Sequence, residues 1–106
     1  MAVHKIKQGD TARVFQDTLT IDGEAMDLTG ASVAFVMMNV CSGEAQRGTA
    51  SIISATAGTV RYQPTTTNVA TVGRYRAEWE ITYVGGKIQT VPEEGYIDIW
   101  IQTQLG

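Results

Sequence analysis

GRYRAEWEITY, residues 73–83, alternates more strictly between apolar and polar side chains than any other stretch of the chain. Successive side chains of a strand point to opposite faces, so this pattern predicts a strand with one buried face. The buried parity would hold Tyr75, Ala77, Trp79, Ile81 and Tyr83, and the outer parity Arg74, Arg76, Glu78, Glu80 and Thr82. Gly85 and Gly86 follow, and residues 87–91 then return as an extended run. The whole segment predicts a β-hairpin.

Further short extended runs lie on both sides of this hairpin. We expect strands at residues 3–8, 12–21, 31–40, 49–55, 59–63 and 95–103, with a brief return at 24–28 after the turn pair Asp22-Gly23. Residues 42–48 are polar and are predicted to form a loop. About seven or eight short strands without helical periodicity predict an all-β domain of the β-sandwich type.

Length and composition limit the class of protein. A chain of 106 residues is one domain, residues 1–106, with a single hydrophobic core. Its net charge of −3 gives no basic field for phosphates, so we expect no nucleic-acid partner. No run approaches the roughly 18 apolar residues that span a bilayer, so we expect no membrane segment. The N-terminal residues alternate between polar and apolar side chains and lack the apolar core of a signal peptide. This pattern predicts synthesis and folding in a cytoplasm.

Catalytic and metal chemistry find little support in the sequence. Cys41 is the one cysteine and His4 the one histidine, so thiol catalysis would need these two as nucleophile and base. No third, orienting residue and no sequence signature accompanies them. Asp22, Glu24 and Asp27 cluster near a turn but lack the ordered spacing of a calcium loop. We therefore predict no catalytic residue, no metal ligand and no cofactor.

Acidic residues of the strand predicted at 73–83 raise the possibility of acid–base catalysis. Glu78 and Glu80 lie two residues apart on one face, as paired carboxylates would. Arg74 and Arg76 share that face, so a charge network on a solvated or docking surface is favoured over acid–base catalysis. We predict that the protein is not an enzyme.

Two strands carry apolar side chains on the parity that should face outward. In residues 31–40 one face holds Val33, Phe35 and Met37, and the other face holds Ala34, Val36 and Met38. A strand that is apolar on both faces is covered on both faces, and in a small two-layer domain the second cover can come from another chain. In residues 95–103 three isoleucines form the core face, which leaves Tyr96 and Trp100 outside.

Several segments, in this order and spacing, resemble the N-terminal domain family of phage baseplate upper proteins. They are KQGDT at 7–11, MDLTGASV at 26–33, GTVRY at 58–62, GRYRAEWEI at 73–81, and Pro92 with Gly95-Tyr96 and the closing isoleucine strand. The resemblance covers nearly the whole chain. It implies an immunoglobulin-like antiparallel β-sandwich in a tailed-phage or prophage structural protein, made in the host cytoplasm and located in the virion.

The resemblance also implies a docking or adaptor role in the tail or baseplate. Partners would be other virion proteins of the tail, baseplate or capsid, with a homo-oligomer also possible. The predicted interface has an apolar centre and an arginine rim, in the way that interfaces concentrate binding energy: Val36, Met38, Tyr96 and Trp100 at the centre, Arg74 and Arg76 at the rim.

Two alternatives stay open at this point. A capsid decoration protein is the structural alternative, because small standalone β-domains suit that task as well. A glycan-binding module is an alternative of another class, and it would use Tyr96 and Trp100 as an aromatic platform on the outer face. Locating the chain on the head or the tail of the particle distinguishes a decoration protein from a baseplate module. Binding to host polysaccharide distinguishes a glycan-binding module from both.

Overall fold

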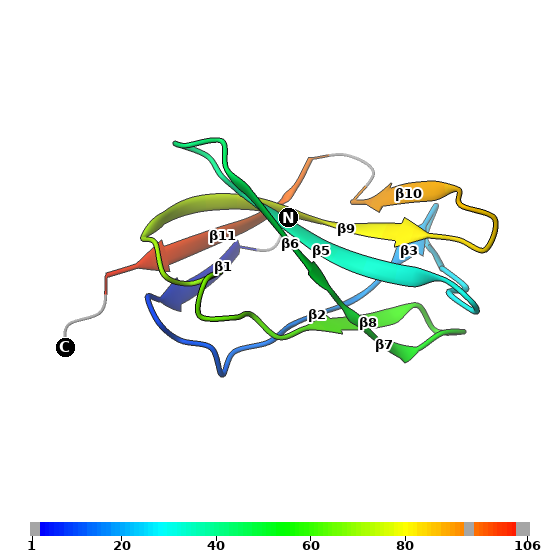
Figure 1. Cartoon of the computed structure of the whole chain (residues 1–106). Helices are drawn as coiled ribbons and strands as arrows, with labels where there is room; N and C mark the ends of the chain where they lie inside the picture. Colours follow the sequence, from blue (N-terminus) through cyan, green and yellow to red (C-terminus); the bar gives the residue numbers. More distant parts are fainter. Residues whose placement is uncertain (1–2, 93–94, 104–106) are drawn as a thin grey trace.

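The computed structural model describes residues 3–92 and 95–103, and in this part of the chain two β-sheets pack face to face (Figure 1). The larger sheet has the order β1-β11-β9-β5-β6, with β10 also beside β9. It contains β1 (Val3–Lys7), β5 (Ser32–Asn39), β6 (Ala45–Thr49), β9 (Gly73–Thr82), β10 (Ile88–Val91) and β11 (Ile97–Gln102). The smaller sheet has the order β2-β8-β7, from β2 (Phe15–Thr18), β7 (Ser51–Ser54) and β8 (Thr59–Tyr62). A separate hairpin joins β3 (Thr20–Ile21) to β4 (Glu24–Ala25).

Strand β9 is the centre of the larger sheet. It pairs along one side with β5, and along the other side first with β11 and then with β10. All these pairings are antiparallel, whereas β1 runs parallel to β11 at the edge of the sheet. The sequence prediction of an all-β sandwich is confirmed.

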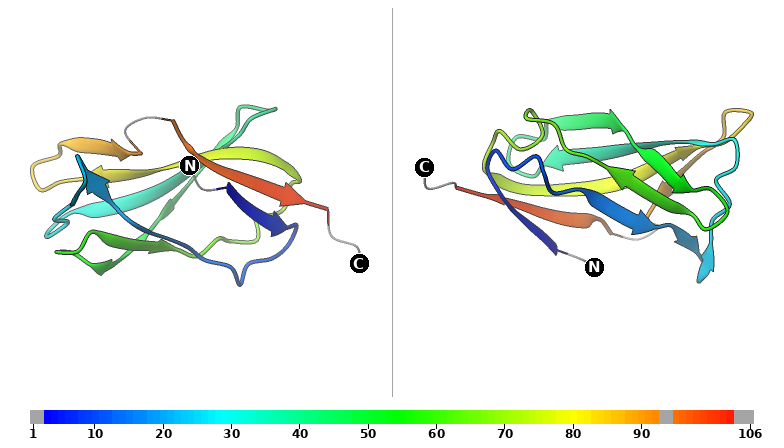
Figure 2. Two further views of the ribbon diagram at one scale, coloured as in Figure 1. Left: turned by 180° about the vertical axis from the view of Figure 1, so that it is seen from behind. Right: turned by 90° about the horizontal axis from the view of Figure 1, so that it is seen from below.

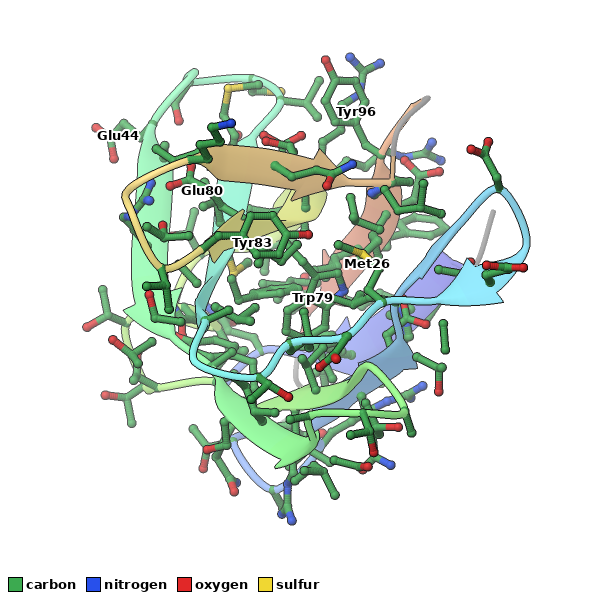
Figure 3. All side chains as sticks on the ribbon, turned by 90° about the vertical axis from the view of Figure 1, so that its right-hand side faces the viewer. Met26, Glu44, Trp79, Glu80, Tyr83 and Tyr96 are labelled. Carbon is green, nitrogen blue, oxygen red and sulfur yellow. The ribbon has the colours of Figure 1, made fainter. Side chains whose placement is uncertain are left out.

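The core lies between the two sheets and is built from the predicted inward parity. Trp79 and Phe35, on neighbouring strands, meet edge to face with ring centroids 4.7 Å apart. Phe35 also stacks on Phe15 and on Tyr62 of the smaller sheet, each at 5.0 Å. Figure 3 shows Trp79 in this interior, below the ribbon of β9. Each of these fully buried aromatic side chains contributes on the order of 1.5–3 kcal/mol by leaving water.

A buried hydrogen-bond network fastens the 63–72 connection to the core. Asn68 is 5% exposed, and its Oδ1 accepts from the Tyr62 hydroxyl at 2.7 Å and from the Thr65 amide at 2.8 Å. Its Nδ2 donates to Gln46 Oε1 at 2.6 Å, which ties the connection to β6. Burial raises the pKa of Tyr62, so its hydroxyl stays protonated and available as a donor.

The structure corrects two boundaries predicted from the sequence. The loop predicted at 42–48 is wrong for residues 45–48, which belong to β6. The single strand predicted at 12–21 is divided, because β2 pairs with β8 whereas β3 pairs with β4. Leu19 lies between them, fully buried, and its amide donates to Gly58 O at 2.7 Å. These divisions raise the number of strands in the described part to eleven, above the seven or eight predicted.

Candidate docking surface

The six residues predicted for a partner interface all lie on the outer face of the larger sheet, away from the smaller sheet. Strand register places Met38 of β5 opposite Arg76 of β9, and Arg76 opposite Asp98 of β11. At the next outward-facing position of β9, Arg74 lies opposite Trp100 of β11. Outward side chains of β5, β9 and β11 therefore form one continuous surface.

We call this surface the docking face and define it by Val36, Met38, Arg74, Arg76, Tyr96 and Trp100. Figure 3 shows Tyr96 outside the sheet, on the side opposite the buried Trp79. Tyr96 is 43% exposed and Met38 is 37% exposed, while Val36 and Trp100 are half-buried. The sequence parity thus predicted correctly which side chains point out of the sandwich.

Cations cover the two aromatic rings of the docking face. The Arg74 guanidinium lies 4.8 Å from the centroid of the Trp100 ring, and Lys5 Nζ lies 5.7 Å from the same ring. Arg76 lies over Tyr96 at 5.3 Å. Each such contact at an exposed site stabilises by about 0.5–1 kcal/mol and holds both partners in place. Because β9 is central, the two arginines lie within the face and not at the rim that the sequence analysis predicted.

Two adjacent hollows open on this face. The larger, here called the basic hollow, has a volume of about 400 Å³ and is lined by the side chains Lys5, Val40, Arg74, Arg76, Asp98 and Trp100. The smaller, called the apolar hollow, has a volume of about 220 Å³ and is lined by Val36, Met38, Ala45, Arg76, Glu78 and Tyr96. Arg76 lines both. The arrangement suits a partner that brings a carboxylate to one hollow and an apolar side chain to the next.

Sequence reasoning missed three residues of the basic hollow, which are Lys5, Val40 and Asp98. Lys5 lies in the first strand, and its approach to Trp100 follows from the parallel pairing of β1 with β11. Long-range pairing of this kind leaves no local pattern in the sequence. Val40 is 45% exposed beyond the end of β5, where its amide donates to Arg74 O at 2.9 Å.

A charge pair borders the docking face. Arg47 of β6 forms an ion pair with Glu80 of β9 across β5. Among residues 3–92 and 95–103, this is the one ion pair within 4.0 Å. Arg74 and Arg76 therefore have no carboxylate of the described residues at that distance. Across the sheet, the carboxylate of Asp98 lies opposite Arg76 in the strand register and lines the same hollow.

The residues considered for catalysis lie on separate elements. Cys41 is an exposed free thiol in the turn after β5, and its amide donates to Asn39 Oδ1. His4 is half-buried in β1, with its ring edge-on to Phe15 at 5.4 Å. Burial lowers the pKa of His4, and the positive charge of Arg13 lowers it further. No hydrogen bond between the thiol and the imidazole occurs in the described part of the chain.

The acidic turn shows no metal site. Within the described residues, no group of three or more His, Cys, Asp or Glu side chains is placed to hold an ion. Asp27 Oδ1 instead accepts from the Thr29 hydroxyl at 2.6 Å and the Thr29 amide at 3.0 Å. These bonds lower the pKa of Asp27, the hydroxyl having the larger effect. In the same ranges, no helix long and apolar enough to cross a membrane is found.

Comparisons with known proteins add the family. The sequence model of the BppU N-terminal domain, the N-terminal domain of phage baseplate upper proteins, matches residues 2–93. A similar solved structure is the N-terminal domain of ORF48 from phage TP901-1, with a TM-score of 0.69 and 16% sequence identity. The alignment covers 98% of this chain and 86% of that one, and at this identity it shows a shared fold. No curated protein matches the sequence significantly.

Proposed function

This chain belongs to the BppU N-terminal domain family, and from that membership we propose that it is a docking module of the phage baseplate. The family places the protein among structural components of the phage tail, and hence in the virion. The same membership supports a structural, non-enzymatic role. The finer proposal is that the docking face binds a neighbouring subunit during assembly.

The observation that carries this proposal is the combination of apolar and cationic groups on the docking face. Exposed Met38 and Tyr96 lie beside Arg76, and Trp100 lies beneath Arg74. Aromatic residues and arginine are the side chains that concentrate binding energy at interfaces. The cation–π contacts also stabilise the face itself, but exposed Met38 and Tyr96 leave water only when a partner covers them.

The covered rings weigh against the glycan-binding alternative. A sugar-binding platform needs a bare aromatic face, but Arg74 and Lys5 lie over the Trp100 ring and Arg76 lies over the Tyr96 ring. The baseplate family likewise favours the tail over the capsid as the location. Neither alternative is supported by a separate feature of the fold.

The test is incorporation into particles of a variant that combines Trp100→Ala with Val36→Asp. Losing one anchor and placing a charge in the apolar hollow should each cost about 2 kcal/mol of binding, so together they weaken docking by about a thousandfold. The matched control is Ile53→Asp, because Ile53 is equally apolar, 54% exposed and on the smaller sheet.

Purified particles are then assayed for the chain by quantitative mass spectrometry. We expect the Ile53 variant to be incorporated normally and the double variant to remain as folded, free protein. Normal incorporation of the double variant, with circular dichroism showing a native fold, would refute the docking face.

A further inference from the structure

One long segment of the chain, residues 14–46, contains acidic but no basic side chains. Between Arg13 and Arg47 the sequence contains no Lys, Arg or His, but it contains the carboxylates Asp17, Asp22, Glu24, Asp27 and Glu44. The basic hollow, by contrast, gathers Lys5, Arg74 and Arg76 against one carboxylate, Asp98. Among the described residues, the basic hollow therefore has more positive than negative side chains, in a protein of net charge −3.

The acidic segment includes the tip of the β3–β4 hairpin. Asp22 and Gly23 adopt positive φ values of 53° and 83°, which make the narrow two-residue turn that twisted hairpins prefer. Asp22, Glu24 and Asp27 are all exposed. The same end of the molecule also carries Lys87, an exposed cation of the β9–β10 turn.

The hairpin and the basic hollow lie toward opposite ends of the molecule. Figure 2 shows β3 and β4 at one end, while β1 and β11 approach the other end, where β9 begins. The molecule is 44 Å long, so the hairpin of one chain cannot reach its own hollow. Opposite charge on opposite ends favours contact between two copies in one orientation.

We propose that the basic hollow receives the acidic β3–β4 hairpin of a second copy of this chain, in a head-to-tail contact. This inference rests on the proposed docking function, and it names the neighbouring subunit. Asp22 and Glu24 of the second copy supply the carboxylates for Arg74 and Arg76. The turn has only two residues at its tip, and a hollow of about 400 Å³ admits such a tip.

Such a contact is heterologous, because two different surfaces meet. Heterologous contacts repeat, and they generate a ring when the rotation closes and a filament when it does not. The apolar hollow of the docking face, with half-buried Val36 and exposed Met38, would lie at the edge of the same contact. The contact is electrostatic in large part, so it should weaken as salt screens the charges.

Two complementary variants test this proposal with the purified chain alone. The hollow variant carries Arg74→Glu and keeps its hairpin. The hairpin variant carries Asp22→Asn with Glu24→Gln and keeps its hollow, and asparagine preserves the tolerance of position 22 for positive φ. Mass is measured by light scattering over a concentration series, at about 0.05 M and at about 0.5 M salt.

We expect the wild-type chain to associate at the lower salt and to dissociate at the higher. Each variant alone should bind itself at least about tenfold more weakly than wild type binds itself. An equimolar mixture of the two should form a complex of two chains and stop there, because that pair retains one intact hairpin and one intact hollow. Wild-type chains that associate head to tail in an open filament can exceed two copies.

Three results would overturn the inference. In the first, the wild-type chain keeps the mass of a monomer at every concentration. In the second, both variants associate as strongly as wild type. In the third, the mixture of variants stays monomeric although wild type associates. None of these touches the docking proposal itself, which depends on particle incorporation of the Trp100 and Val36 variant. Failure of the self-contact with loss of incorporation would assign the docking face to a different virion protein.

Discussion

Replacing Asn68 with alanine tests the buried network that joins the two sheets. The substitution removes one acceptor and one donor, and it leaves three groups without their partner: the Tyr62 hydroxyl, the Thr65 amide and Gln46 Oε1. Tyr62 is 6% exposed, so its orphaned hydroxyl cannot recover a hydrogen bond from bulk water. The other two groups are partly exposed and can be rehydrated.

The expected loss follows from this difference in burial. An orphaned buried hydroxyl costs about 1–3 kcal/mol, and each of the two partly exposed hydrogen bonds contributes about 0.5–1.5 kcal/mol. Together these values span about 2–6 kcal/mol, and because the two partly exposed groups can be rehydrated we expect Asn68→Ala to lower the free energy of unfolding by about 3 kcal/mol, in the lower half of that range. Domains of this size have about 5–15 kcal/mol in all, so the variant should remain folded but be visibly weakened.

Urea unfolding followed by tryptophan fluorescence measures this loss as a shift of the midpoint at unchanged slope. The matched control is Gln63→Ala, since Gln63 is an exposed amide whose Nε2 donates one hydrogen bond, to Thr11 O at 2.6 Å. We expect that control to lose at most about 1 kcal/mol. A double-mutant cycle with Tyr62→Phe should give a coupling of about 1 kcal/mol or more. An Asn68→Ala loss no larger than the control, or a cycle without coupling, would refute the assigned role of the network.

Two further predictions concern stability. Gly48→Ala would place a methyl group 2.7 Å from Cζ of Tyr62, so the ring must move, and we expect a loss of about 1–3 kcal/mol in the same urea assay, with no loss contradicting the contact. His4 has a pKa held below its ordinary value by burial against Phe15, so the unfolded chain takes up a proton first as the pH falls. The stability contribution of His4 is therefore complete above about pH 6.5 and declines toward pH 5. As His4 is the one histidine, His4→Asn should flatten the stability curve in this window, and an unchanged slope would disprove the assignment.

Local pattern was sufficient to predict the strands whose two faces differ. β9 and β11 alternate between buried and outward residues, so both the strand and the direction of each side chain could be predicted from sequence. β6, with the sequence AQRGT, offered no such pattern and was predicted as loop. Contacts with distant residues hold it as a strand: Gln46 bonds to Asn68, Gly48 lies under the Tyr62 ring, and Arg47 pairs with Glu80. Tertiary contacts of this kind override weak local propensity.

The order of strands in the sheet was the other property that no local pattern encodes. Parity predicted that Arg74 and Arg76 face outward, but only the arrangement β11-β9-β5 places them in the middle of the docking face. The basic hollow likewise depends on β1 running parallel to β11, which brings Lys5 from the start of the chain to Trp100 near its end. Residues far apart in the sequence therefore define the part of the surface with the clearest chemical character.

Central arginines change what a partner of this surface must provide. If the arginines formed a rim, an apolar partner could cover Val36 and Met38 while the guanidiniums stayed in water. In the observed arrangement, any partner large enough to cover the face also buries Arg76, which lines both hollows. Burying an unpaired charge costs several kcal/mol, more than a modest apolar contact returns. We therefore expect a stable complex to bring carboxylates near Arg74 and Arg76, in addition to Asp98 of this chain, so that an acidic partner surface is favoured over a merely hydrophobic one.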